Sequence, residues 1–270
     1  MTSKLIPPNP SAVMVIRDVT PNIVTCSAPF YRFGRIKVGG RGTIVRLQSG
    51  ALAVFSPTAL TPEVKEKVES LGGDVKYIAA TDIEHHIFIG AWSKEYPKAK
   101  VIGPEGLPEK RAKQKNEDVH FTYVFTAKNK NDLKIDDDFD ANFDYEFVDG
   151  HANKELVFNY KPERTLIEAD LMFNLPATEQ FSKSGQSPNS GILTKIFIYL
   201  NGTAGAALAQ KRLIWYGPSS ANKPSFNKSV DKIAKWDFDR IIPCHGDVIE
   251  TDGKGIFEKI MEWHIKAANK

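Results

Sequence analysis

Four short apolar segments of this chain end in a histidine or carry an aspartate, and no other feature restricts the possible fold as strongly. The segments are VKYIAAT before His85 and His86, FDYEFVDG before His151, TLIEADLMF with Asp170, and RIIPC before His245. Short apolar runs bounded by turn residues are typical of buried strands. Rigid strand ends are a common place for a functional site. The pattern therefore predicts a sheet whose strand ends bring these side chains to one rim.

The other segments alternate between strand-like and helix-like patterns. VMVIRDV and NIVTCSAPF are interpreted as strands, and GTIVRLQSGALAVFSP as two strands joined by a turn at Ser49–Gly50. TPEVKEKVESLGG predicts a helix that Thr61 caps and Gly72 ends. Further helices are expected from Ile87 to Pro97 and over ILTKIFIYL, AGAALAQKRLIWYG, SFNKSVDKIAKWD, which opens at a Ser cap, and GKGIFEKIMEWHIKAANK. This order predicts a layered α/β sandwich, with residues 1–270 as one domain.

The composition is that of an ordinary soluble protein, with 41% hydrophobic and 26% charged residues. The 36 basic and 33 acidic residues leave a formal charge of +3, which predicts neither a nucleic-acid nor a membrane partner. The start, MTSKLIPPNPSAV, has no apolar core of signal-peptide length, and the two cysteines make no disulfide framework. We therefore expect a cytoplasmic protein that acts on a small molecule, and we leave open whether it forms a homo-oligomer.

Imidazole and carboxylate groups are suitable ligands for zinc, iron or manganese. Adjacent residues inside a helix point about 100° apart, so His85 and His86 can share an ion only at a junction where the first is still extended. An unpaired buried carboxylate is costly, which favours metal ligation for Asp170 over an Arg or backbone partner. His245, in PCHGD, is a further candidate ligand. A pair of adjacent histidines is weak evidence alone, so the order of the motifs carries the argument.

In that order the motifs resemble those of the metallo-β-lactamase superfamily. DGHANKELVF is similar to the GH segment of the family, TLIEADLMF to its apolar strand with an aspartate, and RIIPCHGD to its PGHG segment. EHHIFIGAWSKEYPKAKVIGP is similar to the family's HxHxDH signature from DH onward, including the spacing to Tyr96 and Pro97. The resemblance covers nearly the whole chain and implies a four-layer αββα metallo-β-lactamase sandwich.

The chain departs from the family pattern at the HxHxDH signature. His85 stands at the position of the family's aspartate and His86 at that of its last histidine, while Thr81 and Ile83 replace the two leading histidines. The family's first metal site uses those two histidines with the GH histidine, here His151, so this site is expected to be lost. His151 is then expected to contact substrate or to serve as a further ligand. The resemblance implies one metal ion in the second site, held by His85, His86, Asp170 and His245.

A register shifted by one residue would instead place Asp82 and Glu84 at the two leading histidine positions. Carboxylates there suit a harder ion such as manganese or iron. In the unshifted register, Asp82, Glu84 and Glu168 are candidates for the general base, because His85 replaces the family aspartate that orients water.

These expectations combine into a metal-dependent hydrolase of a small ester, lactone, amide or thioester that uses a metal-activated water. Zinc is the expected metal, with iron or manganese as alternatives. Segments 174–191 and 111–140 are expected to shape the substrate pocket. Two other functions stay open: an iron-dependent oxidoreductase or dioxygenase on the same fold, and a non-catalytic metal-binding protein.

Overall fold

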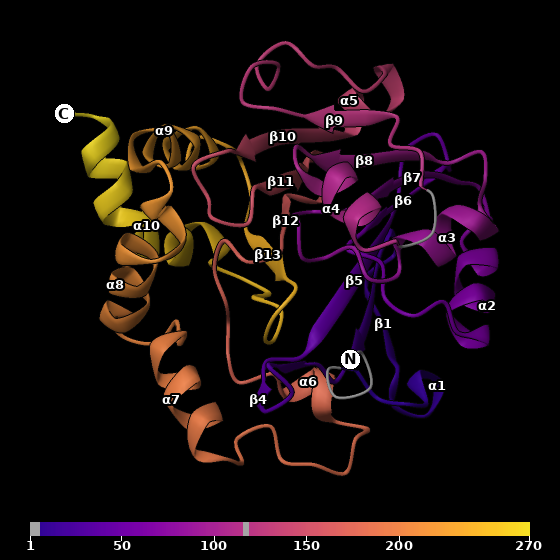
Figure 1. Ribbon diagram of the computed structural model, residues 1–270, viewed down its shortest axis with the longest axis horizontal. Coiled ribbons are helices and arrows are strands. Elements are labelled where there is room, and N and C mark those ends of the chain that lie inside the picture. Colours follow the sequence, from indigo (N-terminus) through magenta and orange to yellow (C-terminus); the bar gives the residue numbers. More distant parts are fainter. Residues whose placement is uncertain (1–5, 116–118) are drawn as a thin grey trace.

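The strands form two packed sheets in the computed structural model, which describes residues 6–115 and 119–270 (Figure 1). Within these residues one sheet has seven strands, in the order β1 (Val15–Thr20), β2 (Ile23–Ala28), β5 (Gly40–Arg46), β6 (Leu52–Phe55), β7 (Val75–Ala79), β8 (Lys100–Pro104) and β9 (Tyr123–Phe125). The other has four, in the order β10 (Phe143–Val148), β11 (Glu155–Tyr160), β12 (Thr165–Glu168) and β13 (Arg240–Pro243). A separate hairpin joins β3 (Tyr31–Arg32) to β4 (Ile36–Lys37).

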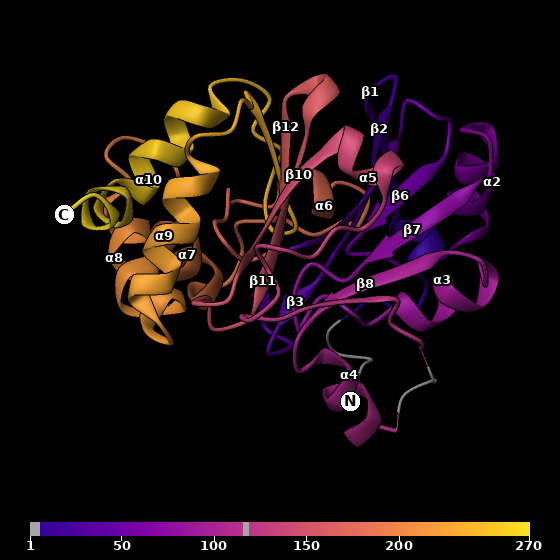
Figure 2. The same ribbon diagram turned by 90° about the horizontal axis from the view of Figure 1, so that it is seen from above.

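Helices cover the outer side of each sheet (Figure 2). On the side of the seven-stranded sheet lie α2 (Pro62–Ser70) and α3 (Ile89–Glu95), and on the side of the other sheet lie α8 (Leu208–Tyr216), α9 (Lys223–Ile233) and α10 (Gly253–Ala268). Shorter helices and α7 lie in the connections: α1 (Pro10–Val13), α4 (Leu107–Lys113), α5 (Asp137–Asn142), α6 (Thr178–Phe181) and α7 (Ile192–Leu200). The predicted four-layer αββα arrangement is therefore confirmed.

Three buried apolar clusters hold the four layers together. Phe55, Phe139 and Phe158 belong to the cluster between the two sheets. Val64 of α2 belongs to the cluster outside the first sheet, and Phe257 of α10 to the cluster outside the second. Each cluster removes a continuous apolar surface from water, which is the main stabilising term in such a fold. The layers in turn fix where the loops between strands and helices lie.

Local sequence signals explain most of these elements. The Thr61 side chain accepts a hydrogen bond from the backbone N–H of Val64, so the predicted cap of α2 is confirmed. Helix α9 differs from the expectation, because its cap is Asn222 and the expected Ser225 donates its backbone N–H to that cap. Segment 174–191, expected as a loop, contains the short helix α6.

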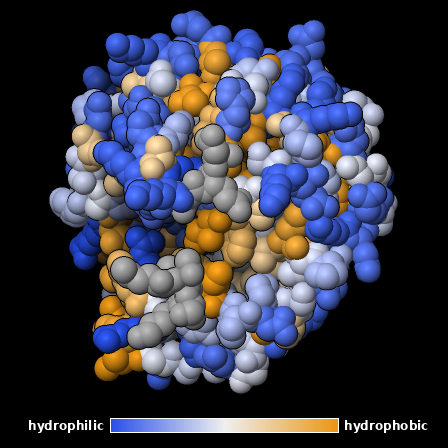
Figure 3. All heavy atoms as spheres, turned by 45° about the vertical axis from the view of Figure 1, so that its right-hand side comes forward, coloured by the Kyte–Doolittle hydropathy of each residue, from blue (hydrophilic) through white to orange (hydrophobic). Residues whose placement is uncertain are grey.

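Polar side chains dominate the face of the molecule that carries α2 and α3, and apolar side chains are visible in a hollow near its centre (Figure 3). Among the described residues, no helix has the length and apolar character needed to cross a membrane.

Candidate metal centre

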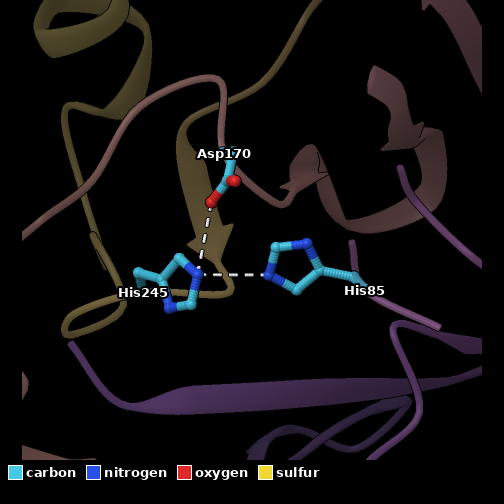
Figure 4. A group of neighbouring side chains, drawn as sticks. All are labelled: His85, Asp170 and His245. Atoms are coloured by element: carbon cyan, nitrogen blue, oxygen red, sulfur yellow. Dashed lines mark hydrogen bonds and ion pairs between the residues drawn. The ribbon is translucent and has the colours of Figure 1, made fainter. Parts of the chain in front are cut away.

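Three side chains from distant parts of the chain converge at one edge of the sandwich (Figure 4). His85 lies in the loop between β7 and α3, Asp170 is the second residue after β12, and His245 is the second residue after β13. His245 Nε2 is 3.1 Å from His85 Nε2 and 3.2 Å from Asp170 Oδ1. One ligand atom from each residue lies within 4.8 Å of the other two. The strand ends therefore bring together three of the four residues that the resemblance implied as ligands.

The hydrogen-bond partners of His85 and His245 determine which nitrogen of each ring is free to bind a cation. His85 Nδ1 is 2.9 Å from Asp82 Oδ1, and His245 Nδ1 is 2.7 Å from the carbonyl oxygen of Gly39. Carboxylate and carbonyl oxygens only accept, so both Nδ1 atoms carry a proton and both Nε2 atoms of the neutral rings present lone pairs. These lone pairs face each other and Asp170 Oδ1. Such an arrangement requires a metal ion, or a proton on one ring, to be stable.

The spacing of the donor atoms fits a metal ion. Two ligand atoms that each lie about 2.0–2.1 Å from a tetrahedral zinc ion are separated by roughly 3.3 Å. The separations of 3.1 and 3.2 Å around His245 are close to this value. Metal-bound histidines usually donate their other ring N–H to a carboxylate or a backbone carbonyl, as His85 and His245 do here. The residues present therefore fit a metal ion in chemistry, and the two separations at His245 fit one in spacing.

The charges around the site favour a bound cation. Burial alone would lower the pKa of His85, but the carboxylates of Asp82 and Asp170 outweigh burial and raise this pKa to about 9. Burial would raise the pKa of Asp170, but His85 and His245 hold it well below its usual range. A metal ion that binds here would displace the proton from His85, because a ligating imidazole is neutral.

A set of buried groups fixes the loop that carries His245. Arg41 donates to the carbonyl oxygens of Pro243 and Gly246, at 2.8 and 2.6 Å. The Gln180 side chain donates to the carbonyl of Cys244 at 2.8 Å and accepts from the backbone N–H of Gly246 at 3.0 Å. His245 is thus held from both sides of the loop before any ligand binds. No local sequence signal marks Arg41 or Gln180, because their contacts join segments far apart in the chain.

His86 does not join the other three candidate ligands. Its Nδ1 lies 3.1 Å from a guanidinium nitrogen of Arg111, which also donates to the His86 carbonyl oxygen. Burial, followed by the charges of Lys110 and Arg111, lowers the pKa of His86 to about 4. The neutral ring therefore packs against α4, and the arrangement around His245 contains three protein ligand atoms.

The two carboxylates before His85 have different surroundings. Asp82 is fully buried, and its Oδ1 accepts from His85 Nδ1 and from the backbone N–H groups of Glu84 and His85. Its Oδ2 has no hydrogen-bond partner among the described residues. The Glu84 side chain is 56% exposed and pairs with Lys110 on the surface. Neither carboxylate belongs to the group of donor atoms formed by His85, Asp170 and His245 in the described structure, so the shifted register gains no support.

His151 and two further carboxyl groups, those of Glu155 and Glu168, are buried close to Asp170. His151 Nδ1 accepts from the backbone N–H of Asn153 at 3.1 Å, so its proton resides on Nε2, which lacks a partner within the described structure. Burial lowers the pKa of His151. Burial and mutual repulsion raise the pKa of Glu155 well above its usual value, and burial does the same for Glu168. Both carboxyl groups accept hydrogen bonds from backbone N–H groups, Glu155 from Ala169 and Asp170 and Glu168 from Leu171 and Met172.

Apolar rings form one wall of the site. The centroids of Phe173 and Phe30 lie 4.7 and 6.0 Å from that of the His245 ring. Phe173 in turn lies 6.0 Å from Phe197 of α7. Segment 174–191 follows Phe173, and its Asn174 donates its backbone N–H to the His245 carbonyl, which supports the expected place of this segment beside the site. Residues 116–118 of the other expected pocket segment lie outside the described residues.

Comparisons with known structures give one recurrent fold. A metallo-β-lactamase from Hirschia baltica is 11% identical with a TM-score of 0.56, and the match covers 93% of this chain and 97% of that chain. The metallo-β-lactamase FIM-1 from Pseudomonas aeruginosa in its mono-zinc form is 12% identical with a TM-score of 0.54, covering 95% and 97%. A mutant flavo di-iron protein from Thermotoga maritima is 12% identical with a TM-score of 0.57, covering 93% and 62%. The chain therefore has the metallo-β-lactamase fold.

A family model described as a domain of unknown function (DUF4336) matches residues 31–183, more than half of the chain. This match includes His85 and Asp170 and ends before His245. Among curated proteins, none matches this sequence.

Proposed function

This chain belongs to the DUF4336 family, and we propose that it is a metal-dependent hydrolase with a single ion held by His85, Asp170 and His245. One observation carries the proposal. The Nδ1 atoms of both histidines are committed to acceptors, so that both Nε2 atoms and a carboxylate oxygen face one point. Three donor atoms are thus in place for a cation. Such an arrangement is expected of metal ligands and not of polar residues packed in a core.

Zinc is the metal that we propose. Two imidazoles and one carboxylate with an open fourth position are typical of catalytic zinc sites, whereas structural sites are closed by four protein ligands. An ion held by these residues would lower the pKa of a bound water and would polarise a carbonyl oxygen. The mono-zinc metallo-β-lactamase among the structural neighbours supports a single ion on this fold.

The surrounding residues have distinct tasks in this proposal. Asp82 and the Gly39 carbonyl keep the two imidazoles in the tautomer that leaves Nε2 available. Phe30 and Phe173 exclude water and offer an apolar wall to the acyl part of a substrate. His151 Nε2–H is a neutral donor that would hydrogen-bond a substrate oxygen.

Of the three carboxylates expected as general base, Asp82 is the one that we propose. It retains an unpartnered oxygen, Oδ2, within the described part of the chain. Glu84 is turned towards Lys110 on the surface. Glu168 also keeps an oxygen without a partner in the described structure, but its other oxygen holds backbone N–H groups of the following loop, whereas Asp82 contacts the proposed ligand His85 directly.

The same three ligand residues also favour a second function, that of an iron-dependent oxidoreductase that reacts with oxygen. Two histidines and one carboxylate on one side of an ion form the arrangement of non-haem iron oxygenases. The flavo di-iron protein among the structural neighbours supports iron on this fold.

Reconstitution with each metal separates the two functions. The protein, loaded with zinc or with iron, is assayed against a panel of esters, lactones, amides and thioesters, and separately for oxygen uptake. The expected result is hydrolysis by the zinc form that is lost in Asp170→Asn and His245→Ala and retained in the surface control Lys98→Ala. Oxygen uptake by the iron form without hydrolysis would select the second function, and neither activity with either metal would contradict both.

A further inference from the structure

Helix α7 is apolar on two opposite sides. Phe197 and Ile198 pack inward on the buried cluster that contains Phe173. The outward side carries large apolar residues that are 46–77% exposed, namely Ile192, Leu193, Ile196 and Tyr199. Their spacing of one, four and seven residues places them on a single helix face. A surface helix of a water-soluble protein normally keeps this face polar, so the outward stripe needs a partner.

Two elements beside α7 add further exposed apolar residues to its outward side. Helix α7 contacts β4 of the small hairpin and the start of α8. Phe33, at the tip of that hairpin, is 77% exposed, and Leu208 of α8 is 44% exposed. Between α7 and α8 lies a cavity of about 350 Å³, lined by Tyr199, Leu200, Leu208, Ala209, Arg212 and Leu213. We call α7, the hairpin tip and the first turn of α8 the apolar face.

The same segments carry positive charge without acidic residues. No aspartate or glutamate occurs between Glu179 and Asp231, a stretch that contains Lys183, Lys195, Lys211, Arg212, Lys223 and Lys228. The hairpin also lies in an acid-free stretch, from Asp18 to Glu63, and adds Arg32 and Arg35. Lys195, Arg212 and Arg35 are exposed, whereas Lys211 pairs with Glu262. Although the overall charge is only +3, the segments that form the apolar face therefore carry an excess of positive charge.

We propose that the apolar face docks on an anionic lipid surface, with α7 lying in the plane of the interface. Exposed aliphatic and aromatic residues beside lysines and arginines are the pattern of interfacial helices. A second copy of the chain would bring like charges together, and a nucleic acid would leave the isoleucines and leucines without apolar contacts. The nine residues of α7 are too short to cross a bilayer, which takes about 20.

Docking would bring the metal centre close to the lipid. The Phe173 ring lies between the two, 6.0 Å from Phe197 of α7 and 4.7 Å from His245. A substrate with an apolar tail would then reach the centre along α7. Docking of the apolar face on lipid does not depend on which reaction takes place at the proposed metal centre.

Vesicle flotation of the full chain tests the proposal. Vesicles of phosphatidylcholine and phosphatidylglycerol, mixed three to one, are compared with vesicles of phosphatidylcholine alone. The wild-type protein is expected to float with the anionic vesicles and to be released by salt. The double variant Ile192→Ser with Ile196→Ser, and the charge reversal Lys195→Glu, are each expected to bind at least tenfold more weakly. Because all three side chains are exposed, circular dichroism and thermal unfolding should remain as in the wild type.

Matched controls lie outside the apolar face. Ile87→Ser removes an exposed isoleucine from the loop between β7 and α3, and Lys98→Glu reverses an exposed lysine between α3 and β8. Neither change should alter vesicle binding. Failure of the wild type to bind anionic vesicles would overturn the proposal. Equal losses in the control variants would do the same. A dimer in sedimentation velocity that the double variant dissociates, without vesicle binding, would instead identify a second copy as the partner.

Discussion

Replacing Asp82 by Asn isolates the contribution of one buried carboxylate to metal binding. Asp82 accepts from His85 Nδ1 at 2.9 Å and from two backbone N–H groups at 2.7 Å, so it sets both the tautomer and the position of a ligand. Asparagine keeps the shape and one acceptor oxygen but removes the charge. Loss of such a partner typically weakens metal binding by about 10–100-fold. This factor corresponds to about 1.4–2.7 kcal/mol of binding free energy.

Competition with a chromophoric chelator measures the dissociation constant for zinc in the wild type and in Asp82→Asn. The matched control is Glu84→Gln, because Glu84 is two residues away but forms only a surface ion pair with Lys110. A surface pair of this kind contributes about 0–1 kcal/mol to stability and should leave the zinc affinity within about twofold of the wild type. Thermal unfolding of each metal-free variant separates a loss of fold from a loss of affinity. An unchanged affinity in Asp82→Asn, or an equal loss in Glu84→Gln, would refute the reasoning.

Three further variants test other parts of the structure. Thr61→Ala removes the cap of α2 and should cost about 1 kcal/mol in urea unfolding, with no change in zinc affinity. Gly39 has φ +71° and a Cβ there would meet the Gln180 side chain at 2.1 Å, so Gly39→Ala should both lower the melting temperature and weaken zinc binding. Burial lowers the pKa of His264 to about 4, so the neutral ring favours the folded state. Stability should therefore fall as pH drops from about 6.5 to about 4, on the order of 2 kcal/mol, and this slope should flatten in His264→Gln.

The strands and the approximate place of the site could be predicted from the sequence, because both depend on local patterns. Apolar runs that end at His85, Asp170 and His245 predict buried strands, and strand ends in a layered α/β fold meet at one edge. The order of the motifs then indicated the metallo-β-lactamase fold, which the structural neighbours show.

The division of roles between His85 and His86 could not be read from the sequence. The two rings diverge because the loop turns between them and Arg111 of α4 pairs with His86. Helix α4 has seven residues, most of them polar, and so shows no apolar periodicity that would predict it. The contacts by which Gly39 and Gln180 hold the His245 loop could not be predicted either. Gly39 and Gln180 are 206 and 65 positions away from His245 in the chain. Contacts of this range follow from the packing of the layers and not from spacing.

Metal content tests the central claim most directly. The wild-type protein, His85→Ala, Asp170→Asn, His245→Ala and His86→Ala are loaded with zinc, dialysed and measured by elemental analysis. The geometry predicts about one ion per chain in the wild type and in His86→Ala, and almost none in the other three variants. Absence of metal from the folded wild type after loading, or a loss in His86→Ala as large as in His85→Ala, would contradict a three-residue metal centre.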